Sequence, residues 1–120
     1  MKILVVDDSR TMRTIVIRTL RKAGFGDHEM VEAANGKDAL KQINSSAPDL
    51  VLCDWNMPEM SGLELLKTLR SDGCEINFGF ITTESSKEMH DRATEAGALF
   101  FISKPFTADI LEDTLSPLVG

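Results

Sequence analysis

The most constraining feature of this sequence is the alternation of short apolar runs with longer segments of helical periodicity. Each short run is bounded by turn residues, which is typical of a strand buried on both faces. The longer segments repeat apolar residues at helical spacing, and most follow a Ser, Thr or Asn that can cap a helix. We expect strands at residues 3–6, 28–34, 50–53, 78–82 and 99–102, and helices at residues 10–22, 36–43, 62–69, 86–96 and 108–116. Either Ser85 or Ser86 is expected to cap the fourth of these helices.

Strands that alternate with helices in this way form βαβ units, with a parallel sheet, right-handed crossovers and helices on both faces. The chain has 120 residues, which is the size of one domain. It shows no internal repeat, no low-complexity segment and no linker to a second domain. The sequence therefore predicts a single α/β domain.

Composition argues against several classes of function. The formal net charge of −6 is unfavourable for binding nucleic acid or an anionic membrane. No apolar run approaches the roughly 20 residues of a membrane span, and no signal peptide follows Met1. The two cysteines, Cys53 and Cys74, do not form a disulfide framework. We expect a reduced, cytoplasmic protein that is monomeric.

Polar residues gather where the expected strands end. Asp7 and Asp8 follow the first strand, Asp54 the third, Thr82 closes the fourth, and Lys104 follows the fifth. In open parallel sheets these ends share one edge, where ligands bind. Three adjacent carboxylates repel one another unless some are protonated or a cation lies between them, and Mg²⁺ favours such oxygen ligands together with a phosphate. Phosphoryl transfer depends on positioning and charge neutralisation, and it uses groups of this kind: a metal, a lysine, a hydroxyl and one rigidly placed carboxylate.

The strand-end residues belong to longer motifs. These are Val5-Val6-Asp7-Asp8-Ser9, Asp54-Trp55-Asn56-Met57-Pro58, Gly62-Leu63-Glu64-Leu65-Leu66-Lys67, Ile81-Thr82 and Lys104-Pro105-Phe106. Together, and in this order along the whole chain, they resemble the receiver domains of response regulators, most of all the stand-alone receivers of chemotaxis. The resemblance implies a flavodoxin-like (βα)5 fold of strand order 2-1-3-4-5. It also implies that residues 1–120 are one receiver domain without an output domain.

The same resemblance implies roles for the acidic residues. Asp54 would be the phosphoacceptor, which takes a phosphoryl group from a histidine kinase. Mg²⁺ would be bound by the side chains of Asp8 and Asp54, by the backbone carbonyl of Asn56, and by Asp7 through water. The protein would be a signalling switch rather than an enzyme, apart from promoting its own phosphorylation and dephosphorylation.

The resemblance also implies how the signal would leave the site. Lys104 would pair with the phosphoryl group, the Lys104–Pro105 bond would be cis, and Thr82 would donate its hydroxyl to a phosphoryl oxygen. The ring of Phe101 would then turn into the space that Thr82 leaves. This would change the face made by the fourth helix, fifth strand and fifth helix, where a protein target binds. The flagellar motor switch is a candidate target, and a phosphatase is a candidate partner.

Several alternatives remain open. The chain could be a phosphate sink, the receiver of another two-component or phosphorelay pathway, or a receiver separated from its output domain. A Mg²⁺-dependent phosphohydrolase would often carry a second acid where Asn56 stands. A flavodoxin-like cofactor binder would need a phosphate-cradling loop, whereas the loop after the first strand is acidic and no G-x-G-x-x-G motif occurs. Asp7 and Asp8 alone could simply stabilise a helix N-terminus.

Some residues depart from the family pattern. Phe101 replaces a common Tyr, and the chain has no Tyr at all. Because Phe has no hydroxyl to satisfy when buried, we hypothesise that the inward rotamer is easier here. Gly79 should weaken the fourth strand, and Thr83 replaces a smaller residue, so it could crowd the route to Asp54. His90, on the polar fourth helix, lacks metal-ligand spacing and is expected to be solvent-exposed.

Overall fold

The computed structural model describes residues 1–84 and 86–119. Five strands alternate with five α-helices, as the sequence predicts. The strands are β1 (Lys2–Val6), β2 (Glu29–Ala33), β3 (Leu50–Cys53), β4 (Asn77–Thr82) and β5 (Phe100–Ser103). The helices are α1 (Arg10–Leu20), α2 (Gly36–Ser46), α3 (Gly62–Ser71), α4 (Lys87–Glu95) and α5 (Ala108–Val119), with a short π-helical turn η1 (Arg21–Phe25) after α1.

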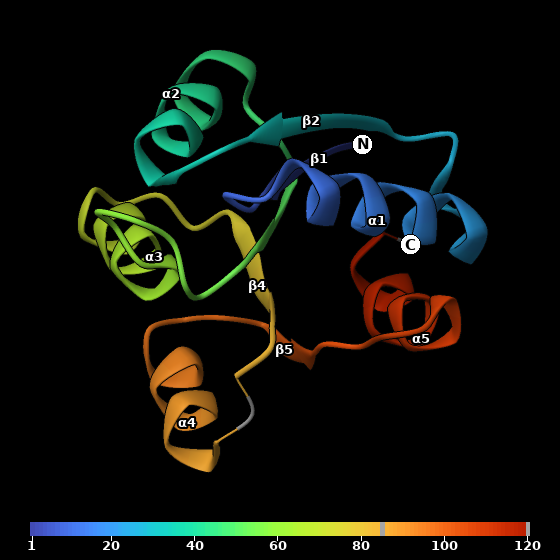
Figure 1. Ribbon diagram of the computed structural model, residues 1–120. Coiled ribbons are helices and arrows are strands. Elements are labelled where there is room, and N and C mark those ends of the chain that lie inside the picture. Colours follow the sequence, from blue (N-terminus) through green and yellow to red (C-terminus); the bar gives the residue numbers. More distant parts are fainter. Residues whose placement is uncertain (85, 120) are drawn as a thin grey trace.

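The strands form one parallel sheet of order β2-β1-β3-β4-β5. Helices α1 and α5 cover one face, and α2, α3 and α4 lie on the other (Figure 1). The predicted flavodoxin-like (βα)5 fold is therefore confirmed, including the edge position of β2. Within the described ranges, no helix has both the length and the hydropathy needed to cross a membrane.

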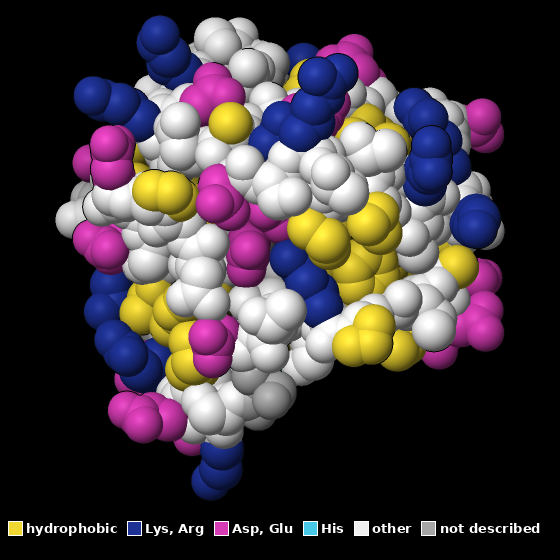
Figure 2. All heavy atoms as spheres, in the orientation of Figure 1, with side chains coloured by type: hydrophobic (Ala, Val, Ile, Leu, Met, Phe, Trp, Pro, Cys, Tyr) yellow, Lys and Arg dark blue, Asp and Glu magenta, His cyan; other side chains and the backbone are white. Residues whose placement is uncertain are grey.

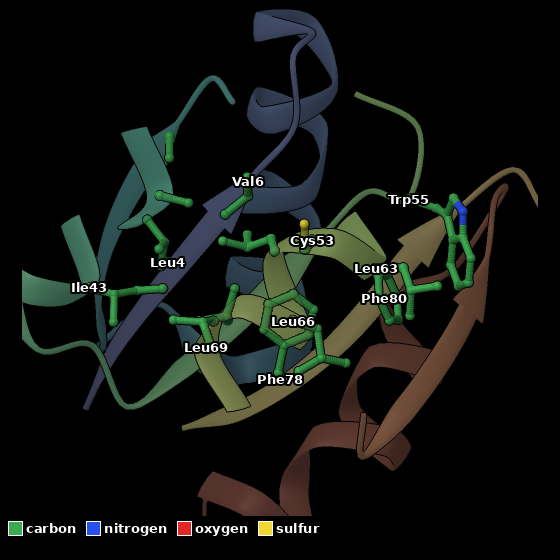
Figure 3. Close-up of a cluster of buried hydrophobic side chains, with 14 of the residues drawn as sticks. Leu4, Val6, Ile43, Cys53, Trp55, Leu63, Leu66, Leu69, Phe78 and Phe80 are labelled. Carbon is green, nitrogen blue, oxygen red and sulfur yellow. The ribbon is translucent and has the colours of Figure 1, made fainter. Parts of the chain in front are cut away.

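Two hydrophobic clusters separate the helices from the sheet. The first lies under α2 and α3 and contains the rings of Phe78 and Phe80, which are fully buried (Figure 3). The second lies under α1 and α5 and includes Leu111 and Leu115. Every residue of β3 is buried, because a central strand contributes to both clusters. This explains why its sequence is continuously apolar rather than alternating.

Several helix ends differ from the prediction, among them that of α3, which runs to Ser71 rather than to residue 69. The α-helix of α1 stops at Leu20 instead of Lys22, and the following segment η1 is kinked at Gly24, whose φ of 100° is not helical. Helix α2 extends past Ile43 to Ser46 and ends at Ala47, which has a left-handed φ of 46° and whose backbone N–H still donates to the carbonyl of Ile43. Helix α5 continues through Pro117 to Val119. A proline so near the end of a helix removes only one backbone hydrogen bond.

The cap of α4 is one of the two predicted serines, and the first residue of β5 differs from the prediction. Ser86 caps α4 by accepting a hydrogen bond from the backbone N–H of Met89 at 3.2 Å, whereas Ser85, the alternative cap, lies outside the described residues. Strand β5 begins at Phe100, and Leu99 is 52% exposed although the pattern placed it in a buried strand. Leu99 lies in the connection from α4, directly before the edge strand β5 begins.

The structure also explains Gly79, which the sequence left without a purpose. Gly79 pairs with Phe100 across β4 and β5, and a Cβ atom at position 79 would lie 2.1 Å from the Cζ atom of Phe100. The glycine therefore leaves room for the ring of Phe100 to lie over the strand.

We expect Gly79→Ala to lower the free energy of unfolding by about 1–3 kcal/mol, the usual cost of overpacking. Urea denaturation measures this change. The matched control is Gly26→Ala, because a Cβ atom there would be 3.6 Å from the Cγ atom of Arg21 and the φ of −65° suits alanine. Equal stability of the two variants would show that the ring of Phe100 moves aside without cost.

Candidate functional site

The site begins where β1 and β3 end side by side. These strands are paired in register up to Val6 and Cys53, and the backbone N–H of Asp54 donates to the carbonyl of Val6 at 2.9 Å. Asp7 and Asp54 therefore follow neighbouring strand ends. The buried apolar runs before them fix the backbone, so both carboxylates project from rigid positions.

Three carboxylates meet at this edge. Oxygen atoms of Asp7, Asp8 and Asp54 lie within 4.8 Å of one another. Asp7 is buried, Asp54 is half-buried and Asp8 is exposed. The backbone N–H of Ser9 donates to Oδ1 of Asp7 at 2.9 Å, and the Ser9 hydroxyl caps α1. The beginning of α1 thus holds the buried carboxylate in place.

Lys104 reaches the carboxylates from the end of β5. Its backbone N–H donates to the carbonyl of Thr82 at 2.7 Å, and its peptide bond to Pro105 is cis, as expected. The Nζ atom lies 3.1 Å from Oδ2 of Asp7 and 3.5 Å from Oδ2 of Asp54. One ammonium therefore bridges the buried carboxylate and the predicted phosphoacceptor.

Thr82 and Asn56 lie at the same edge but make other contacts. Thr82 is fully buried at the end of β4, and its hydroxyl accepts a long hydrogen bond of 3.4 Å from the backbone N–H of Glu84. The side-chain amide of Asn56 donates to Oε1 of Glu84 at 2.9 Å. This bond joins the loops after β3 and β4. Glu84 was not among the site residues predicted from the sequence, because its partner Asn56 lies 28 residues away in the chain.

The thiol of Cys53 lies directly before Asp54 in the chain. Burial raises the pKa of the Cys53 thiol well above its usual range, and the negative charges of Asp54 and Asp7 raise it further, against a smaller opposing effect of Lys104. A thiol held protonated is a poor nucleophile. Cys53, which is fully buried at the end of β3, is therefore a core residue.

An apolar hollow adjoins the charged site. It is lined by Met12, Ile15, Thr83, Lys104, Pro105 and Phe106. Figure 2 shows acidic and basic side chains meeting near the centre of the face, with a hydrophobic patch beside them over the region between α1 and α5. Thr83 is exposed and contributes to this hollow.

The donor set of the edge suits a hard divalent cation. All three clustered side chains offer carboxylate oxygens, and the single ammonium of Lys104 leaves the group net negative. Mg²⁺ is bound in proteins by one or two carboxylates and retains several waters, which the exposed side of Asp8 permits. The residues present therefore fit Mg²⁺.

The fold is a doubly wound α/β sheet with three carboxylates and a lysine at its carboxyl edge, which is where ligands bind in such sheets. Residues 3–116 match the response regulator receiver domain. The chain is 45% identical to chemotaxis protein CheY1 of Helicobacter pylori, over 100% of this chain and 98% of that protein. It is 42% identical to CheY-3 of Vibrio cholerae, over 98% and 91% of the two chains.

Solved structures agree with these relatives. The chemotaxis protein CheY4 of Vibrio cholerae superposes with a TM-score of 0.85 at 34% identity, covering 98% of this chain and 97% of that one. This chain therefore belongs to the response regulator receiver family. It is a receiver of the CheY type, and such receivers are signalling proteins that bind Mg²⁺ at an acidic pocket.

Proposed function

We propose that residues 1–120 act as one receiver domain that takes a phosphoryl group on Asp54 from a histidine kinase. The observation that carries the proposal is the position of Asp54, whose carboxylate lies in the acidic cluster and 3.5 Å from the ammonium of Lys104. A nucleophile, a cation site and a fixed positive charge therefore surround one point at the carboxyl edge.

The transfer is a displacement at phosphorus. A carboxylate oxygen of Asp54 forms an O–P bond while the N–P bond of the kinase's phosphohistidine breaks, and the departing imidazole takes up a proton. With a small acyl phosphate, the bond that breaks is O–P and a carboxylate leaves. Water attacking the same phosphorus later returns Asp54 to its free form, so the signal ends in the same site.

The acidic residues would hold the metal in distinct ways. Asp8 and Asp54 would ligate Mg²⁺ by their side chains, Asn56 by its backbone carbonyl, and Asp7 through water. When bound, Mg²⁺ neutralises charge on the transferring phosphoryl group. Asp7 keeps its own pairing with Lys104 and so orients that ammonium toward Asp54.

Two groups at the edge are placed to respond to a new phosphoryl group. Lys104 would exchange its contact with the Asp54 carboxylate for one with the phosphoryl oxygens. Thr82 would give up its long bond from Glu84, which is 3.4 Å, and donate its hydroxyl to a phosphoryl oxygen. Either movement transmits the local change in charge to the ends of β4 and β5.

The output would be a change in the face formed by α4, β5 and α5. Phe101 lies in β5, where its half-buried ring packs against Trp55 and Phe80, at centroid distances of 6.2 and 6.0 Å. This packing supports the hypothesis that the inward position is readily taken without a tyrosine hydroxyl. Leu99, directly before β5, and Ile110, in α5, are exposed apolar residues and would contact the protein target.

The chemotaxis names of the relatives favour a target in chemotaxis, with flagellar motor control as the leading candidate. A phosphate sink would share the chemistry at Asp54 but would bind no target. The phosphohydrolase alternative is less favoured, because the amide of Asn56 occupies the position of the second acid and is hydrogen-bonded to Glu84.

Incubation with Mg²⁺ and a small acyl phosphate tests the proposal. We expect intact-protein mass spectrometry to show one added phosphoryl group, which is lost in alkali as acyl phosphates are, and which does not form when a chelator removes the metal. No added mass in Mg²⁺, or equal addition with the chelator present, would contradict the proposed function.

A further inference from the structure

The ring of Phe101 is enclosed on two sides by other rings. Trp55 and Phe80 lie toward the core, with Trp55 directly after Asp54 in the chain (Figure 3). The imidazole of His90, from α4, packs against Phe101 with a centroid distance of 5.4 Å and an interplanar angle of 50°. His90 is exposed to solvent as expected, but it is also part of an aromatic row that runs from the phosphoacceptor's neighbour to the surface of α4.

Few other contacts hold α4 in place. Among the described residues of this helix, only Ala93 is buried, and Met89 is half-buried. The helix stands beside the edge strand β5 (Figure 1). The contact between His90 and Phe101 therefore adds to the packing that Ala93 and Met89 provide between α4 and the core.

The position of the Phe101 ring depends on packing alone. A phenylalanine has no hydroxyl, so no hydrogen bond can fix the ring in either direction. Removing a contact on one side of the ring must then change how often the ring occupies its place against Trp55.

We propose that His90 is a positioning residue for Phe101, which holds the ring against Trp55 and Phe80. The consequence for signalling rests on the proposed function. A phosphoryl group on Asp54 and a protein bound to α4 act on the same ring, one from each side. In this chain, α4 is therefore linked to the site through the imidazole of His90.

The test compares His90→Ala with His90→Phe in the metal-free, unphosphorylated protein. The readout is the nuclear Overhauser effect between the Trp55 indole and the Phe101 ring. We expect His90→Ala to raise the population with Phe101 away from Trp55 by roughly three- to tenfold, the range expected for one aromatic contact. His90→Phe, which keeps a ring at this position, should restore the wild-type signal.

The control is Lys87→Ala, which truncates an exposed residue of the same helix and should leave the signal unchanged. Unchanged Overhauser effects in His90→Ala would overturn the inference, as would a failure of His90→Phe to restore them in a folded protein. Because the measurement needs neither metal nor phosphoryl donor, it separates this inference from the proposed function. If His90→Ala weakens the Overhauser effect but the protein accepts no phosphoryl group, the positioning role of His90 stands and the proposed function is rejected.

Discussion

Asp54→Asn is expected to abolish phosphorylation by an acyl phosphate, with a rate loss of roughly thousandfold or more, as for other essential nucleophiles. The amide has nearly the same shape as the carboxylate, but it is neutral and a far weaker nucleophile. The backbone of Asp54 is fixed by its bond to Val6, so the fold should survive the substitution. Intact-protein mass spectrometry after incubation with Mg²⁺ and donor measures the effect.

Asp72→Asn is the matched control, because Asp72 is an exposed aspartate at the end of α3, outside the acidic cluster. It should be phosphorylated at the wild-type rate. If Asp54→Asn is phosphorylated in the same yield as wild type, the acceptor is a residue other than Asp54. That result would remove the basis of the proposed function.

Lys104→Met should have two separable effects. Without the ammonium, Asp7 and Asp54 lose their shared counter-charge, and we expect the free energy of unfolding in metal-free buffer to fall by about 1.5–3 kcal/mol, the worth of hydrogen bonds to charged groups. Phosphorylation should slow roughly hundredfold, as when one preorganised donor to a developing charge is removed. Denaturation curves and the mass assay measure the two effects separately.

Added Mg²⁺ should distinguish the loss of stability in Lys104→Met from its loss of phosphorylation rate. A cation bound to the native carboxylates stabilises the folded state, so it should recover much of the lost stability of Lys104→Met. It should not recover the rate, because a cation held by the carboxylates would not supply the hydrogen-bond donor that Lys104 would give to the phosphoryl oxygens. Recovery of the wild-type rate at saturating Mg²⁺ would show that Lys104 serves only to balance the charge of the acids.

The fold was predictable because its signals are local. Apolar runs such as 50–53 and helical periodicity are read directly from the chain, and parallel strands then bring their carboxyl ends to one edge. This is why Asp7, Asp8, Asp54 and Lys104 could be placed together before the structure. Helix ends were less accurate, since α2 ends where Ala47 takes a left-handed φ of 46°, a conformation that an alanine does not announce in the sequence.

Contacts between side chains of distant elements were not predictable. Lys104 lies closer to Asp7 than to Asp54, and Asn56 bonds to Glu84 across two loops. Gly79 makes sense only once Phe100 is seen to cover it. Similarly, a solitary histidine on a polar helix gave no sign that it would pack against Phe101. These contacts depend on side-chain rotamers and on the pairing register of the strands, which composition and hydrophobic periodicity do not give.

The most direct test uses Trp55, the only tryptophan, which is 7% exposed, follows Asp54 and packs against Phe80 at 5.0 Å. Its fluorescence would be followed while Mg²⁺ and then a small acyl phosphate are added to wild type and to Asp54→Asn. We predict a metal-dependent change in wild type, then a donor-dependent change that is lost in the variant. A wild-type protein that responds to neither addition, or a variant that responds fully to the donor, would contradict the assignment of Asp54 as the phosphoacceptor.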